Sequence, residues 1–315
     1  LLARAENRRA IILMLISSVA QSYFDLLQLD TQRNIALRAL SSWQESVAIS
    51  RAQLEGGVIS RLDLDQFEAE RANAAARLAG FERLIAQKEN ELNVLIGKNP
   101  APILRVHSLS MQQMPLEIPA GLPSELLQRR PDILQSEQTL AAATARIGMT
   151  KAMRFPSFSI TGILGVASPA LSNLLLSDSQ FGVGGMGLAG PLFNANSLGF
   201  EQRAAEAQVR QALANYEQTI LVAFKEVEDA LIAIRTTKDQ REAKQAQVTA
   251  LQSALHVADL RYKGGLTSYV DVLLAKRNLF EAEFSLTETH RLHLVSIVQL
   301  YRALGGGWNP GDEYN

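Results

Sequence analysis

Long stretches of the chain repeat apolar residues at the period of a helix. The clearest stretch spaces its apolar side chains three and four residues apart: Val209, Leu213, Tyr216, Ile220, Phe224, Val227, Leu231 and Ile234. Such spacing is typical of a narrow coiled-coil stripe. Together with similar runs it predicts four long helices, over residues 5–55, 61–96, 197–263 and 269–304. At 1.5 Å per residue the third helix would span roughly 100 Å, which favours a rod over a compact globule.

These helices form two copies of one hairpin. The first pair is joined through Gly56-Gly57 and the second through Gly264-Gly265, and each copy closes on Gly and then Asn-Pro, at Asn99-Pro100 and Asn309-Pro310. Both Gly-Gly pairs suit the left-handed geometry that ends a helix. A single hairpin buries little apolar surface. The repeat therefore predicts that the hairpins pack side by side, or against other subunits.

The same residue types restart the helix after each turn. Ser60 and Ser268 are placed as N-caps, and Asp63 and Asp271 follow three residues later, at the spacing of a capping box. An acidic residue in the first turn also suits the helix dipole. Helix capping is therefore the first interpretation of these four residues.

The middle of the chain follows a different pattern. Residues 99–121 are Pro-rich and irregular, and a helix is predicted over 132–153, with Pro131 suited to its first turn. Apolar and small residues then alternate along residues 157–167, with one face formed by Phe158, Ile160, Gly162, Leu164 and Val166. A second extended segment covers Gln180–Phe193. The pair fits a transmembrane β-hairpin, although a soluble hairpin has the same period.

The pattern divides the chain into five parts. Residues 1–100 form the first helical hairpin, 101–153 a linker and helix, 154–196 the β-hairpin, 197–310 the second helical hairpin, and 311–315 a tail. The predicted fold class is mainly α with a small β part, built on duplicated coiled-coil hairpins.

Composition removes several classes of function. The formal net charge is −1 and the pI about 6.5, which argues against a nucleic-acid surface. The chain has no cysteine, so disulfides, thiolate metal sites and a cysteine nucleophile are excluded. Arg8-Arg9 before the apolar stretch Ala10–Ala20 imitates a signal peptide, but a continuing amphipathic helix is favoured. Gln21, Asp25 and Gln28 also argue against a spanning helix.

Two motifs that could indicate a dinucleotide site or a metal site lack the neighbouring residues that such sites need. Gly182–Gly187 matches the G-x-G-x-x-G dinucleotide fingerprint, but no helix is predicted directly after it. His290 and His293 lie three apart on a helix, without an evident third metal ligand. We expect no catalytic residue, no cofactor and no metal site.

Four segments resemble the outer-membrane factor family, the TolC-like efflux ducts, and within it the OprM/NodT-type branch of lipoproteins that serve resistance-nodulation-division (RND) pumps. They are Leu122-Pro-Ser-Glu-Leu-Leu-Gln-Arg-Arg-Pro-Asp-Ile133, Pro191-Leu-Phe193-Asn194, Arg261-Tyr-Lys-Gly-Gly265 and Tyr301-Arg-Ala-Leu-Gly-Gly-Gly-Trp308. The first is long and specific, and the match covers essentially the whole chain.

The resemblance implies a homotrimeric channel in the outer membrane of a Gram-negative bacterium. Each subunit would give strands to a β-barrel in outer-membrane lipid and helical hairpins to a periplasmic α-barrel. The duct would dock with a periplasmic adaptor, or membrane fusion protein, and an inner-membrane RND-type transporter. It would export small molecules, as in multidrug resistance, without chemistry. Many members carry a palmitoylated lipoprotein anchor.

The resemblance also implies where this sequence departs from the family. The first strand pair, earlier helices and lipidated Cys of the family have no counterpart, so the chain is expected to be an N-terminally truncated form. At the periplasmic end, Tyr262 and Asp271 match the residues that close the duct. Thr267 and Leu274 replace an arginine and a second acid. Gate candidates are therefore Tyr262, Gly264, Gly265 and Asp271, with Asp63 of the first hairpin ranked lower.

Two functional alternatives stay open from the residues. An exit duct would open by untwisting the second hairpin around Gly264-Gly265, and Asp271 would either ring the mouth or only cap its helix. The other alternative is a soluble α-hairpin adaptor or scaffold protein without a pore.

Overall fold

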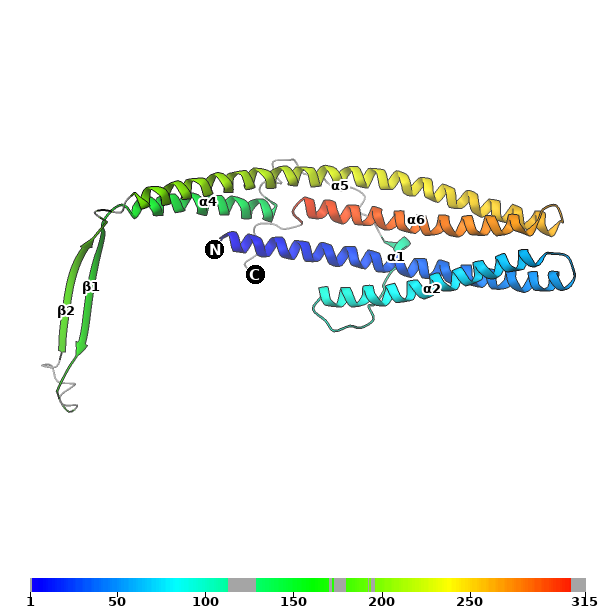
Figure 1. Cartoon of the computed structure of the whole chain (residues 1–315), viewed down its shortest axis with the longest axis horizontal. Coiled ribbons are helices and arrows are strands. Elements are labelled where there is room, and N and C mark those ends of the chain that lie inside the picture. Colours follow the sequence, from blue (N-terminus) through cyan, green and yellow to red (C-terminus); the bar gives the residue numbers. More distant parts are fainter. Residues whose placement is uncertain are drawn as a thin grey trace. The chain divides into compact units, whose positions relative to one another are not determined.

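The computed structural model describes residues 2–112, 129–169, 172, 180–191, 193 and 196–306. Its elements are α1 (Leu2–Glu55), α2 (Arg61–Leu95), η1 (Leu109–Met111), α4 (Pro131–Ala152), β1 (Ser157–Val166), β2 (Gln180–Ala189), α5 (Ser197–Lys263) and α6 (Tyr269–Ala303), and all except η1 are labelled in Figure 1. The predicted mainly α fold with four long helices and one β-hairpin is confirmed. Residues 122–128 of the specific motif and the tail 311–315 lie outside the described residues.

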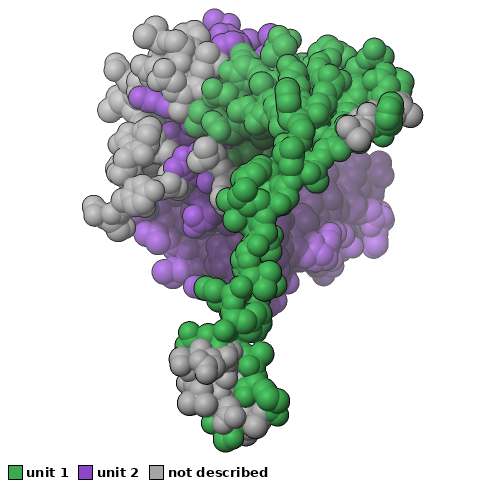
Figure 2. Space-filling model, turned by 90° about the vertical axis from the view of Figure 1, so that its left-hand side faces the viewer, with its two compact units in different colours: residues 1–4, 133–220 green, residues 5–132, 221–315 purple. Residues whose placement is uncertain are grey.

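The chain forms two compact units, coloured green and purple in Figure 2. One contains residues 1–4 and 133–220, and the other residues 5–132 and 221–315. The division of the chain into five consecutive parts, which the sequence suggested, stays a prediction.

The larger unit contains the first helical hairpin and most of the second, with α1 packed against α2 and α6. Trp43 of α1, Phe67 of α2 and Leu273 of α6 belong to one buried cluster. Asp25 of α1 forms ion pairs on both sides, at 3.4 Å with Lys88 of α2 and at 3.0 Å with Arg291 of α6. The apolar stripes of the two hairpins therefore bury each other, as the repeat predicts.

Both inter-helix turns have the same backbone. Gly57 and Gly265 each adopt a φ of +72°, the left-handed conformation that glycine tolerates. The next amide of each turn, that of Val58 or Leu266, donates to a carbonyl five residues back, at 2.8 Å and 2.9 Å. These bonds form the Schellman motif that satisfies the last carbonyls of a helix. The predicted glycine C-caps are confirmed.

The two helix starts differ from each other. Ser60 caps α2 through a complete capping box: its Oγ accepts from the amide of Asp63, while the Asp63 carboxylate accepts from the amide of Ser60 at 3.0 Å. Ser268 has the extended backbone of an N-cap, but among the described residues its side chain makes no capping hydrogen bond. Thr267 instead donates to the Asp271 carboxylate. The predicted second capping box is therefore wrong, because the preceding hydroxyl binds the carboxylate that the box requires.

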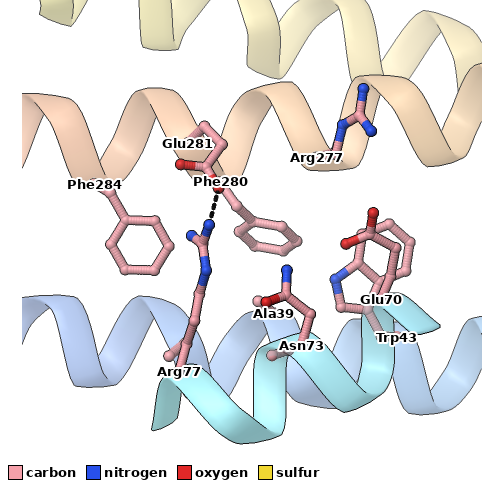
Figure 3. Close-up of a pocket in the computed structure, with 11 residues that line it drawn as sticks. Ala39, Trp43, Glu70, Asn73, Arg77, Arg277, Phe280, Glu281 and Phe284 are labelled. Carbon is pink, nitrogen blue, oxygen red and sulfur yellow. Dashed lines mark ion pairs between the residues drawn. The ribbon is translucent and has the colours of Figure 1, made fainter. Parts of the chain in front are cut away.

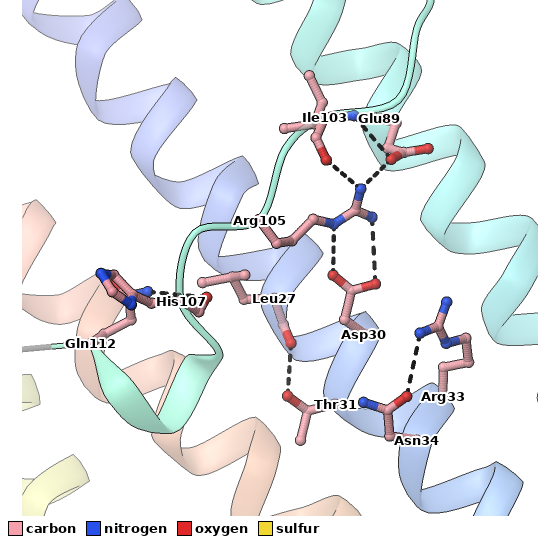
Figure 4. A network of polar contacts seen from close by, with 10 residues as sticks. All are labelled: Leu27, Asp30, Thr31, Arg33, Asn34, Glu89, Ile103, Arg105, His107 and Gln112. Atoms are coloured by element: carbon pink, nitrogen blue, oxygen red, sulfur yellow. Dashed lines mark hydrogen bonds and ion pairs between the residues drawn. The ribbon is translucent and has the colours of Figure 1, made fainter.

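The segment after α2 is fixed to the first hairpin by Arg105 (Figure 4). Its guanidinium donates to Asp30 of α1 at 2.8 Å, and it also pairs with Glu89 of α2 and the carbonyl of Ile103. Leu109 in η1 is then buried against Leu27 of α1 and Leu294 of α6. These contacts lead the chain out of the first hairpin across α1 to α6.

A second arginine holds the start of α4 to the end of α6. Arg130 is 6% exposed and donates to Asp132, to Glu226 of α5 at 2.8 Å and to the carbonyl of Ala303 at 3.1 Å. Gly305 follows with a φ of +87°, and a Cβ there would lie 2.9 Å from the carbonyl oxygen of Arg129. This arrangement accounts for Arg130 and Asp132 at the start of α4 and for a glycine at position 305 after α6.

The β-hairpin belongs to the smaller unit and is antiparallel, with Gly162 opposite Gly184. Residues opposite each other share a face, so Phe158 and Leu188, and Ile160 and Met186, form one apolar face. These four side chains are at least 62% exposed. The extended segment predicted to Phe193 ends as a strand at Ala189, since Gly190-Pro191 follows and proline has no amide hydrogen to donate.

The expectation that the first helix does not span a membrane stays a prediction. By length and composition alone α1 could cross one, a criterion that the core helix of a soluble protein or an N-terminal signal sequence also meets. The ion pairs of Asp25 place this part of α1 against α2 and α6.

The unequal caps predict unequal costs of the same substitution. Ser60→Ala removes a complete capping box and should destabilise the fold by about 1 kcal/mol. Ser268→Ala removes a hydroxyl that caps nothing and should change stability by well under half of that. Thermal unfolding of the two matched variants measures the difference, and equal losses would contradict the assignment.

The Arg130 contacts predict a larger loss. Arg130→Ala leaves the Ala303 carbonyl and the Glu226 carboxylate without this partner and should cost about 2–3 kcal/mol. Arg302→Ala is the control, because Arg302 reaches the same Glu226 only at 3.6 Å from a more exposed position. The measurement is again thermal unfolding, and a loss no greater than that of the control would count against the arrangement.

Candidate functional site at the hairpin turns

Aromatic rings from both hairpins meet behind the two Gly-Gly turns. Tyr262 at the end of α5 lies against Tyr269 at the start of α6, with ring centroids 4.5 Å apart. Tyr269 lies 4.7 Å from Phe67 of α2, which lies 6.4 Å from Trp43 of α1. Phe280 completes the cluster at 6.3 Å from Trp43. The cluster joins the two copies of the repeat near their turns, and it is called the turn cluster below.

Two polar side chains of α6 are held at this cluster by hydrogen bonds to one serine. Ser46 of α1 is fully buried and accepts hydrogen bonds from Tyr269 at 3.1 Å and from Lys276 at 3.0 Å. Burial lowers the pKa of Lys276 and raises that of Tyr269. The Lys276 ammonium also lies 5.8 Å from the centre of the Trp43 ring. Both shifts indicate a cluster that excludes much of the solvent.

Tyr262 contacts the first hairpin directly. Its hydroxyl accepts a hydrogen bond from the side-chain amide of Gln53 near the end of α1. Within the described residues, the Gln53 side-chain oxygen and the Ser50 hydroxyl are buried without a hydrogen-bond partner. Unpaired buried groups weaken the packing they belong to. The contact between hairpins is therefore less complete here than at Ser46.

The two acidic candidates lie in different surroundings. Asp271 is exposed and is held by Thr267, whereas Asp63 is partly buried and belongs to the capping box with Ser60. Asp65, close to it, accepts from Arg61 at 2.9 Å. The structure thus brings Tyr262, Gly264, Gly265 and Asp271 together at one turn and leaves Asp63 at the other. Any gating role for these residues stays a prediction.

A shallow groove runs between α2 and α6 beside the turn cluster, with which it shares Trp43 and Phe280 (Figure 3). Its floor is formed by Ala39 and Trp43 of α1. Arg77 of α2 crosses it to pair with Glu281 of α6 at 2.6 Å, and its guanidinium lies 5.4 Å from the Phe284 ring. The groove is thus partly closed by an ion pair between the two hairpins.

The histidine pair faces α5. His293 is buried and shares a hydrogen bond with Thr237 at 2.9 Å, while burial and then Arg241 lower the pKa of His290 to about 4. Within the described residues there is no group of three side chains able to hold a metal ion. The glycines 182–187 lie inside β2, so an extended strand takes the place of the helix that would hold a pyrophosphate.

Sequence reasoning missed the residues that carry the contacts between hairpins. Gln53, Ser46 and Lys276 are polar residues within long helices, and nothing in their spacing distinguishes them from a solvated face. Their role depends on which helices are neighbours, and this comes from the packing of the two repeats.

A model of the outer membrane efflux protein family matches residues 1–98 and 122–306. The toluene efflux pump outer membrane protein TtgC of Pseudomonas putida is 37% identical over 308 residues, covering 98% of this chain and 63% of TtgC. The cation efflux system protein CusC of Escherichia coli is 38% identical over 309 residues, covering 98% of this chain and 67% of CusC.

A solved structure of an outer membrane channel has a similar fold. The open state of the Neisseria gonorrhoeae MtrE outer membrane channel superposes with a TM-score of 0.86 at 31% identity, over 97% of this chain and 69% of that one. The chain thus spans 63% of the length of TtgC and about two thirds of the other two proteins. From its fold and these matches, the chain belongs to the outer membrane efflux protein family.

Proposed function

We propose that the chain is the main part of a subunit of a trimeric outer-membrane channel, a passive exit duct for small molecules. The observation that carries the proposal is the joining of two features in one chain. Two repeated helical hairpins bury each other's apolar faces side by side, and a β-hairpin exposes an apolar face. An array of hairpins suits the wall of a tube, and an exposed apolar strand face suits lipid.

The partners follow from the same proposal. Three copies would complete the tube, and the duct would work with a periplasmic adaptor and an inner-membrane transporter of the RND type. The names of the relatives support export from the cell, of toluene by one pump and of a cation by another system. Because those cargoes differ, the proposal names no cargo. It also includes no catalytic step, since an exit duct only conducts.

The second hairpin turn is proposed as the part that opens. Asp271 is exposed there, beside Gly264-Gly265, and Tyr262 links the turn to the first hairpin through Gln53. Three copies of Asp271 around an axis would give a negatively charged ring that favours cations. The alternative role of Asp271 as a helix cap is less favoured, because its carboxylate binds Thr267 and no capping box forms among the described residues.

The membrane assignment predicts that charge is tolerated on one strand face only. Ile160→Arg puts a cation on the proposed lipid face and should cost about 2–4 kcal/mol, so trimer in the outer-membrane fraction should fall several-fold. Thr161→Arg, on the opposite face, is the matched control and should assemble at close to the normal level. Quantitative gels of fractionated membranes measure both. Release of the unaltered protein without detergent would instead favour the adaptor alternative.

The turn assignment predicts a change in ion selectivity. Asp271→Asn should reduce the preference of the channel for cations, because the negative ring loses its charge. Asp63→Asn is the control: it removes the same charge from the first turn and should alter stability more than selectivity. Reversal potentials of single channels in a salt gradient measure the effect. Equal selectivity in the two variants would remove Asp271 from the proposed mouth.

A further inference from the structure

A depression on the larger unit is not used by the proposed duct. It lies between α5 and α6, under η1, and encloses about 1090 Å³ including its open mouth. Its apolar wall is formed by the half-buried Leu286 of α6, while Leu109 of η1 lies at its edge and is itself buried against Leu27 and Leu294. Its polar wall includes Arg241 and Gln245, one helical turn apart on α5, and His290 on α6. Residues four apart share a helix face, so the first two side chains leave α5 in the same direction.

Three hydrogen-bond donors of this depression have no partner within the described part of the chain. The Arg241 guanidinium, the Gln245 amide and the His290 ring make no hydrogen bond or ion pair there. Arg241 lies close enough to His290 for its charge to lower the pKa of that ring. The pKa of His290 is about 4, so the ring is neutral at neutral pH and has one N–H to donate. An unpaired guanidinium beside two neutral donors is the arrangement that binds a carboxylate.

Charges around the depression favour this ligand with one exception. Lys238, one turn before Arg241 on α5, adds positive charge near His293. Glu242 also lines the depression and has no ion pair among the described residues, so it opposes an anion. Glu242 is exposed, so solvent and salt screen its charge more than that of a buried group.

We propose that this depression binds a small amphipathic carboxylate. The carboxylate pairs with Arg241 and accepts from Gln245 and His290, and the apolar tail lies against Leu286. The site is independent of the proposed export function, because it uses none of the residues of the turns or of the strands.

Octanoate is the probe, with the intact protein in a non-ionic detergent. Isothermal titration should detect octanoate, and much weaker binding of octanol, which lacks the charge, and of acetate, which lacks the tail. Arg241→Gln should weaken octanoate binding ten-fold or more, since a charge-assisted pair is lost. Arg235→Gln, an exposed arginine on the same helix, is the control and should leave binding unchanged. Glu242→Gln should strengthen it.

A second readout locates the ligand. Bound carboxylate favours the imidazolium, so octanoate should raise the pKa of His290 from about 4 towards its ordinary value. Ring-carbon NMR of the four histidines follows this titration, and His290→Gln assigns the signal. No octanoate binding, equal binding by Arg241→Gln and Arg235→Gln, or an unchanged His290 titration would each overturn the proposal.

Discussion

The fold depends on the mutual burial of two similar hairpins. Helix α6 is the most completely enclosed helix of the described chain, with buried residues from Val272 near its start to Ala303 at its end. It packs against α1 through Leu294 and Leu273 and against α5 through Leu279. Separating the repeats would expose this whole length. Apolar burial along α6 therefore determines where the other helices lie.

Two arginines attach the connecting segments to the helices of the two hairpins. Arg105 fixes the chain as it leaves the first hairpin, and Arg130 fixes it before α4 begins. Each is held by carboxylates from two places and by a backbone carbonyl, so each joins segments that are distant in sequence. A guanidinium suits this role because its donors point in fixed directions and it remains charged.

Much of the local structure was predictable from the residues. The Gly-Gly turns, the Ser60 cap and the alternating strand residues reflect short-range geometry, which depends on neighbours in the sequence. The second capping box was wrong because a hydroxyl one position earlier, Thr267, competes for the carboxylate. The turn cluster and the Arg241 depression were not predictable, since each forms only when separate helices come together. Spacing within one helix does not show which helix will face it.

The difference between the two turns bears on how a duplicated protein diverges. In the first copy the carboxylate of Asp63 is needed to begin its helix, so its loss harms the fold. In the second copy Asp271 is exposed, Thr267 is the one hydrogen-bond partner of its carboxylate in the part of the chain that the structure describes, and no capping box begins its helix. The acid of the second copy is thus released from a folding role and can be kept for the charge it carries, while the acid of the first copy preserves the scaffold.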